Sequence, residues 1–152
     1  MKKFVVCLTL LFSCFVLVGN AMAAGFEDEC IAKCKEAAQL VKDKGIDAGV
    51  AAINKKDGGF VSKDTLVILF NFEGVVLAHP TKPDTIGKNR MKDKDSKGKA
   101  YYQEYVEVAK TKGSGWVEHM WVSPDKKEFQ KKTYVQRVEG QDMAVCAGYI
   151  IK

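Results

Sequence analysis

The chain has 152 residues and carries 24 Lys and Arg against 19 Asp and Glu, a formal net charge of +5. This length fits one domain with a sizeable core. The basic residues alternate with acidic ones, as in residues 92–95 (KDKD), which is typical of a solvated surface and argues against a nucleic-acid-binding stripe, so we expect no nucleic-acid partner.

The first 23 residues have the features of an export signal. Residues 1–3 are basic, residues 4–18 are apolar apart from Thr9 and Ser13, and residues 21–23 (AMA) place small side chains where a signal peptidase cleaves. The apolar stretch of about 15 residues is shorter than the roughly 20 that span a membrane. We therefore expect cleavage after Ala23.

Such a cleavage leaves one domain at 24–152 in the periplasm or outside the cell. Its charge is +3, because Lys2 and Lys3 are removed from the total of +5. No second apolar span follows, so the mature chain is not expected to cross a membrane. An uncleaved anchor and a lipoprotein signal ending at Cys14 are the two alternatives.

Three cysteines remain in the mature chain, in a compartment that permits disulfides. Cys30 and Cys34 are one helical turn apart, and Cys146 lies in the last apolar segment. An odd number allows at most one internal bridge. We favour a bridge from the helix to Cys146, while a Cys30–Cys34 bridge and no bridge stay open. The spacing fits neither haem attachment nor a zinc site, so we expect no metal and no cofactor.

The first half of the mature chain predicts two helices and a hairpin. Apolar residues recur at three- and four-residue steps over 27–44, and a shorter helix follows at 47–54. Residues 65–72 and 75–79 are rich in β-branched and aromatic side chains and flank a Glu-Gly turn, which predicts a hairpin. A long polar segment at 80–98, of the kind that is more often functional than not, leads into a helix at 99–112.

The second half predicts three strands, at 116–122, 131–138 and 143–151. Short turns join them, so they form an antiparallel meander. The strands at 65–72 and 143–151 are the most apolar, which is typical of strands covered on both faces, and we expect them to pair. The result is an α+β fold with a five-stranded sheet in the order 2-1-5-4-3 and helices beside it.

Short motifs occur in order along this layout. Residues 76–80 (VLAHP) follow the hairpin turn, residues 86–89 (IGKN) lie in the polar segment, and residues 113–117 (GSGWV) open the third strand. Together they resemble the single Cache domain, the extracytoplasmic ligand-binding module of bacterial chemoreceptors and sensor kinases, over residues 26–151. The resemblance implies a PAS-like sheet, a long N-terminal helix, and a pocket between the sheet and the loop-helix segment.

Two features depart from that family. Its receptors continue past the last strand into a membrane helix and a signalling output, whereas this sequence ends at Lys152. We therefore expect a free-standing binder or an accessory subunit that acts on a membrane receptor or sensor kinase. The family also usually has Tyr where this chain has His119, so the pocket chemistry is expected to differ from that of carboxylate-sensing relatives.

Candidate ligand contacts come first from the polar segment and the helix after it. His79 can donate a hydrogen bond or change its charge near neutral pH, although it can equally cap its strand. Arg90, with Lys88 beside it, carries a guanidinium shaped for a carboxylate, although a loop Arg is more often solvated. Tyr102 follows on the helix.

The other candidates lie on two strands. Alternation places Trp116 on one face and His119 and Trp121 on the other, without showing which face meets the pocket. Lys132 and Tyr134 share a face of the next strand, and we place Tyr134 near His119 or Trp121; each aromatic residue has plain core packing as its alternative. The predicted ligand contacts are His79, Arg90, Tyr102, Trp116, His119, Trp121, Lys132 and Tyr134.

The sequence holds none of the common nucleophile, phosphate-loop or zinc-protease motifs, so we do not expect an enzyme. The predicted function is binding of a small polar molecule, such as an organic acid or amine, whose occupancy is relayed to a partner in signalling or chemotaxis. One alternative is an interaction subunit whose pocket is filled by its own side chains. A small secreted enzyme is the other.

Overall fold

Five antiparallel strands form one sheet in the order β2-β1-β5-β4-β3, which confirms the predicted α+β topology. The computed structural model describes residues 14–151, and of residues 14–24 it describes the backbone alone. The elements in chain order are α1 (Cys14–Lys44), α2 (Ile46–Ile53), β1 (Val67–Asn71), β2 (Val76–Ala78), the 3-10 turn η1 (Pro83–Thr85), α3 (Tyr101–Thr111), β3 (Ser114–Val122), β4 (Glu128–Arg137) and β5 (Met143–Ile150).

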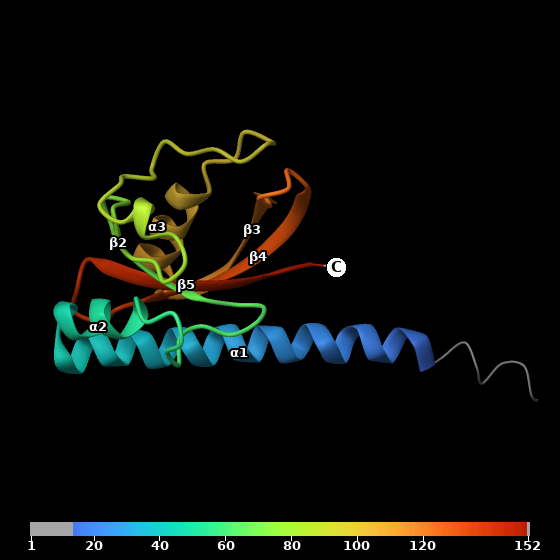
Figure 1. Ribbon diagram of the computed structural model, residues 1–152, viewed down its shortest axis with the longest axis horizontal. Helices are drawn as coiled ribbons and strands as arrows, with labels where there is room; N and C mark the ends of the chain where they lie inside the picture. The colour runs from blue at the N-terminus through green and yellow to red at the C-terminus, as the bar shows by residue number, and fades with distance from the viewer. Residues whose placement is uncertain (1–13, 152) are drawn as a thin grey trace, which may run out of the picture.

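Helices cover both faces of this sheet (Figure 1). The helices α1 and α2 lie against one face, which we call the α1 face. Helix α3 and the segment 80–100 lie over the other, which we call the cavity face. The central strand β5 is buried from Met143 to Tyr149, because alternate side chains pack into the two separate cores. This explains its nearly continuous apolar sequence.

Helix α1 is longer than the sequence predicted, since it begins at Cys14 rather than at residue 27. Residues 14–23 fall within the predicted export signal, so the predicted helix began only at Glu27. Residues 1–13 of that signal lie outside the described residues. The N-terminal part of α1 extends beyond the edge of the sheet (Figure 1). Among the helices of the described chain, none combines the length and apolar character of a membrane span.

The predicted bridge from α1 to Cys146 is wrong, because all three cysteines are buried free thiols. Cys30 and Cys34 belong to the core on the α1 face, whereas Cys146 points into the core on the opposite side of the sheet. The Cys34 thiol donates to the Tyr134 carbonyl over 3.7 Å, and Cys30 Sγ lies 3.5 Å from the Thr65 hydroxyl. The sheet itself therefore separates the two ends of the expected bridge.

The polar segment folds back over the sheet, as the family resemblance implied. Its first part pairs with the β2 edge, where the Gly87 N–H donates to the Val76 carbonyl over 2.8 Å and the Arg90 N–H donates to the Gly74 carbonyl over 2.8 Å. Gly74 has a φ of 81° and lies against Met91, so a side chain there would be strained and would clash. This attachment holds the segment above the cavity face.

Candidate functional site

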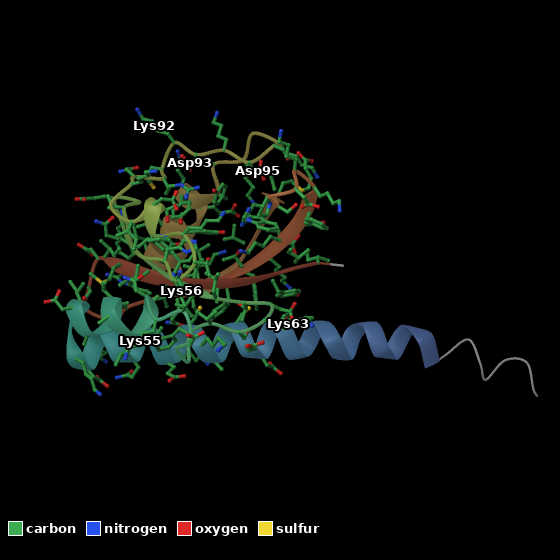
Figure 2. The ribbon with its side chains drawn as sticks, in the orientation of Figure 1. Lys55, Lys56, Lys63, Lys92, Asp93 and Asp95 are labelled. Atoms are coloured by element: carbon green, nitrogen blue, oxygen red, sulfur yellow. The ribbon has the colours of Figure 1, made fainter. Side chains whose placement is uncertain are left out.

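A cavity of about 300 Å3 lies between the cavity face of the sheet and the segment 80–100. Its floor comes from β3, β4 and β5, one wall comes from α3, and the roof comes from the polar segment. Figure 2 shows Lys92, Asp93 and Asp95 on this segment, on the side of the sheet away from α1. Polar and aromatic lining residues include His79, Lys82, Arg90, Lys94, Asp95, Tyr101, Tyr102, Tyr105, His119, Trp121, Lys131 and Thr133.

Asp95 fastens the roof to the free edge of β3. One of its carboxylate oxygens accepts the N–H groups of Lys97 and Lys99 over 3.0 and 2.8 Å, and the other accepts the Met120 N–H over 2.9 Å. Burial raises the pKa of Asp95, but these three donors together lower it below its ordinary value. Both oxygens are thus engaged by the backbone, and Asp95 works as a structural anion.

His119 supports the aromatic wall with both ring nitrogens. Its Nδ1 lies 2.9 Å from the Met120 carbonyl, which can only accept, so Nδ1 carries the hydrogen. Nε2 then accepts from the Tyr105 hydroxyl over 2.7 Å, and the ring stacks on Tyr101 at 4.4 Å. Burial lowers the pKa of His119 and favours the neutral ring. His119 lines the cavity, and both of its ring nitrogens are already bonded within the protein.

His79, by contrast, offers a free donor. The Lys82 N–H donates to its Nδ1 over 3.2 Å, so the hydrogen of the neutral ring is on Nε2, which has no partner among the described residues. The residue is only 8 % exposed. Burial, together with the charges of Lys82, Lys131 and Arg90, lowers the pKa of His79 to about 4. At neutral pH it is therefore an uncharged N–H donor.

Arg90 organises the tyrosines at the mouth of the cavity. Its Nε pairs with Asp93, its Nη2 donates to the Tyr101 hydroxyl over 3.1 Å, and its guanidinium carbon lies 5.3 Å from the centre of the Tyr102 ring. The Tyr102 hydroxyl has no partner among the described residues, and burial raises its pKa, so it stays protonated and can donate. Arg90 and Tyr102 thus line the cavity, and their prediction as ligand contacts stays a prediction.

Lys131 is one of several cavity residues absent from the predicted contacts, together with Lys82, Lys94, Asp95, Tyr101, Tyr105 and Thr133. Lys131 lies directly opposite His119 in the β3–β4 register, so the two side chains share the cavity face. Its Nζ lies 6.0 Å from the centre of the Trp121 ring and has no carboxylate or hydrogen-bond partner in the described part of the chain. Burial lowers the pKa of Lys131. This cation lacks the counter-ion that a sheltered ammonium normally has.

Three predicted contacts lie on the α1 face instead. Trp116 is opposite Tyr134 in the β3–β4 register, so these two rings share a face and Tyr134 cannot approach His119 or Trp121 as expected. Lys132 Nζ lies 2.5 Å from Glu27 of α1 and 4.9 Å from the centre of the Trp116 ring. These residues attach α1 to the sheet and are remote from the cavity.

The register that distinguishes Lys131 from Lys132 is set by the β3–β4 turn. The Ser123 N–H donates to the Lys127 carbonyl, and β4 begins at Glu128 rather than at residue 131 as predicted. Extending the strand back to that turn would have paired Trp121 with Phe129 and His119 with Lys131. The signal was present in the apolar Phe129, which the predicted loop left unassigned.

Taken together, the cavity carries four basic side chains, Lys82, Arg90, Lys94 and Lys131, against the single carboxylate of Asp95. Cavity groups that have no partner among the described residues include His79 Nε2–H, the Tyr102 hydroxyl and Lys131 Nζ, and all three are donors. An arrangement of convergent donors and cations suits a small anion. Among the described residues, no group of three His, Cys, Asp or Glu side chains is placed to hold a metal ion.

Comparison with solved structures finds other proteins with this fold. A methyl-accepting chemotaxis protein from Vibrio parahaemolyticus RIMD 2210633 matches with a TM-score of 0.69 and 16 % identity, over 90 % of this chain and 96 % of that one. A periplasmic sensor domain of a chemotaxis protein matches with a TM-score of 0.62 and 20 % identity, over 94 % and 99 %. At such identities the likeness establishes the fold.

A third structure, titled as the basis for carboxylic acid recognition by a Cache chemosensory domain, matches with a TM-score of 0.63 and 20 % identity, over 92 % of this chain and 90 % of that one. No curated protein sequence matches the chain. The family model described as Cache domain matches residues 46–152, which covers the whole sheet, the polar segment and α3. On this match, and with the fold in agreement, the chain belongs to the Cache domain family.

Proposed function

We propose that this chain is an extracytoplasmic sensory module that binds a small organic acid in the cavity and relays its occupancy to a membrane receptor or sensor kinase. The observation that carries the proposal is the pair of unpartnered donors, Lys131 Nζ and His79 Nε2–H, inside a cavity with four basic side chains. A sheltered charge without a partner is costly, so a carboxylate that pairs with it gains binding free energy.

The same geometry favours acids over amines, both of which the sequence left open. A ligand ammonium needs acceptors, and the one carboxylate in the lining, Asp95, already receives three backbone N–H groups. The four nearby cations would repel a further positive charge. Carboxylic acid recognition by a protein of the same fold is consistent with this preference.

Relay of occupancy requires two states with different ligand affinity. The roof is joined to β2 by backbone hydrogen bonds and to β3 through Asp95, so a ligand that contacts both roof and floor stabilises their closed arrangement. The fold of chemotaxis sensor domains supports a receptor or kinase as the partner. The export-signal features of residues 1–23 support a location outside the cytoplasm.

The cavity argues against the alternative of an interaction subunit with a closed pocket. That alternative requires the protein's own side chains to fill the space beneath the segment 80–100. A volume of about 300 Å3 is present there, at the lower end of the range for small-molecule sites. The open volume therefore favours a bound ligand over a pocket filled by the protein itself.

Matched pairs of compounds test the proposal. Thermal unfolding is followed in the presence of lactate and of alanine, which share a carbon skeleton and a carboxylate and differ in the ammonium; acetate with glycine and succinate with aspartate extend the series. We expect acids to raise the melting temperature by mass action and their amino counterparts to do so much less. Stabilisation by amines or amino acids, with none by any acid, would contradict the proposal.

A further inference from the structure

Lys131 presents a primary amine to the cavity from the middle of its floor. The residue is half-buried, and its Nζ lies under the Trp121 ring with no partner among the described residues. Its neighbour Lys132 is also sheltered but faces α1, where Glu27 holds its ammonium at 2.5 Å. Two adjacent lysines therefore differ in one respect: only the one in the cavity is free to react with a ligand.

The surroundings of Lys131 lower the pKa of its ammonium group. Its pKa is lowered by burial first and by the charge of Lys82, against the opposing influence of Cys146 and Cys30. Lys131 lies opposite His119 in the β3–β4 register and lines the same cavity as His79, and its charge lowers the pKa of both histidines. Lysines that are desolvated beside another cation supply neutral amine at moderate pH and serve as nucleophiles toward carbonyl groups.

The cavity can hold an acid so that a carbonyl group meets this amine. Lys82 and the Nε2–H of His79 are available to a carboxylate, and Lys131 lies within the same space of about 300 Å3. In an α-oxo acid the carbonyl carbon is bonded directly to the carboxylate carbon. A carboxylate held by those groups therefore brings the electrophilic carbon close to Lys131, which is the proximity that imine formation requires.

We propose that Lys131 captures small α-oxo acids in the cavity as a covalent imine, an inference that rests on the proposed anion-binding function. The neutral Nζ attacks the carbonyl carbon and forms the C–N bond. The carbonyl oxygen leaves as water with the two amine hydrogens, so no oxidant or reductant is needed. Uptake of one proton gives an iminium, which keeps a positive charge beside the ligand carboxylate.

This chemistry would add a second level of discrimination to the site. Acids without an α-oxo group, such as lactate, bind by charge and hydrogen bonding alone and leave at the rate of a non-covalent ligand. Acids with an α-oxo group dissociate more slowly, because the C–N bond must first be hydrolysed. The sensor then reports the oxidation state of the acid as well as its presence.

Reductive trapping tests the proposal on the purified chain. The protein is incubated with pyruvate and cyanoborohydride, and the product is measured as intact mass and as proteolytic peptides. We expect one reduced adduct per chain, located on Lys131, with Lys132 unmodified and with excess lactate slowing the reaction. The K131R variant, which keeps the positive charge, should lose the adduct, whereas K132R should keep it.

The wild-type peptide map decides the question even where a variant folds poorly. An adduct that is absent, or spread over exposed lysines at the same rate in wild type and K131R, overturns the inference. If lactate and pyruvate both raise the melting temperature and no adduct forms, the covalent step is refuted and anion binding stands. If neither acid raises the melting temperature, anion binding itself is refuted.

Discussion

The two faces of the sheet differ in whether their polar side chains are paired. The successive residues Lys131 and Lys132 show this contrast most clearly. On the α1 face, Glu27 accepts from Lys132 at 2.5 Å and from the Tyr149 hydroxyl at 3.1 Å, so donors and acceptor are matched. On the cavity face, Lys131 has no such partner among the described residues. Strand alternation thus lets one element join a helix to the sheet while presenting an unpaired cation to a ligand.

The two faces also differ in whether a substitution affects the stability of the fold alone or ligand binding as well. Apolar residues from α1, β1 and β5 fill the α1 face, so the cost of changing them falls on folding. The cavity face has its own core of Phe70, Tyr105 and Val117 beside the open space, so a change there alters both folding and the shape of the site. Substitutions on each face can therefore test the division.

The largest effect is expected from truncating neighbouring core residues of β1. Phe70 and Leu69 are fully buried on the cavity and α1 faces respectively. F70A should lower the free energy of unfolding by about 3–5 kcal/mol and L69A by about 2–5 kcal/mol. Only F70A should also weaken acid binding, because the Phe70 ring lies 5.6 Å from that of Tyr102. Urea unfolding measures the free energy of unfolding, and ligand titration measures the affinity for the acid. An equal loss of affinity in L69A would contradict the expected difference between the two faces.

The second effect concerns pH. Because the folded-state pKa of His79 is lowered from 6.5 to about 4, the unfolded chain binds more protons between these values. Stability should therefore fall as the pH drops through this window, by up to about 3 kcal/mol from this residue. The H79Q variant should lose that part of the decline, while His119, whose pKa is also lowered by burial, keeps its share. Unfolding curves at several pH values test this, and an unchanged profile in H79Q would count against it.

The third effect distinguishes the two lysines. K131M removes a charge-assisted hydrogen bond to the acid, worth about 1.5–3 kcal/mol, or roughly a ten- to hundred-fold loss of affinity. The unliganded protein should be no less stable, because an unpaired and desolvated cation has been removed. K132M should bind the acid as wild type does. Isothermal titration with lactate gives both affinities, and similar losses in the two variants would refute the assignment of faces.

The smallest effect is expected at the contact between α1 and the sheet. E27Q removes an ion pair that is partly exposed, so the loss at neutral pH should be at most about 1 kcal/mol. Lys132 holds the pKa of Glu27 below its ordinary value of 4.5, so this stabilisation is present above that value and is lost as the pH falls below it. Chemical unfolding of E27Q measures the loss. A changed affinity for lactate would show that the two faces are coupled.

The strand order was predictable because turns and apolar content determine it. The short connections of the last three strands and the buried character of β5 led to the order 2-1-5-4-3 without reference to any contact. The presence of a cavity beneath the polar segment followed only from the family resemblance. The predicted contacts His79, Arg90 and Tyr102 lie on or beside that segment and line the cavity.

The face of each strand was not predictable in the same way. Alternation divides a strand into two sets of residues but does not say which set meets the helix, so Lys132 and Tyr134 were chosen over Lys131 and Thr133. A shift of one residue in register moves every side chain of a strand to the opposite face of the sheet. The cysteine bridge failed for a related reason, because Cys146 points away from α1.

The most direct test of the central claim observes Lys131 itself during ligand binding. Isotope-labelled lysine side chains are followed by NMR through a pH titration, with and without lactate, and assigned with K131R and K132R. We predict that lactate shifts the Lys131 signal and raises its pKa, because a carboxylate then pairs with the ammonium, and that Lys132 is unaffected. A saturating titration that moves Lys132 alone, or neither lysine, would contradict the claim that the cavity face holds an acid through its unpaired donors.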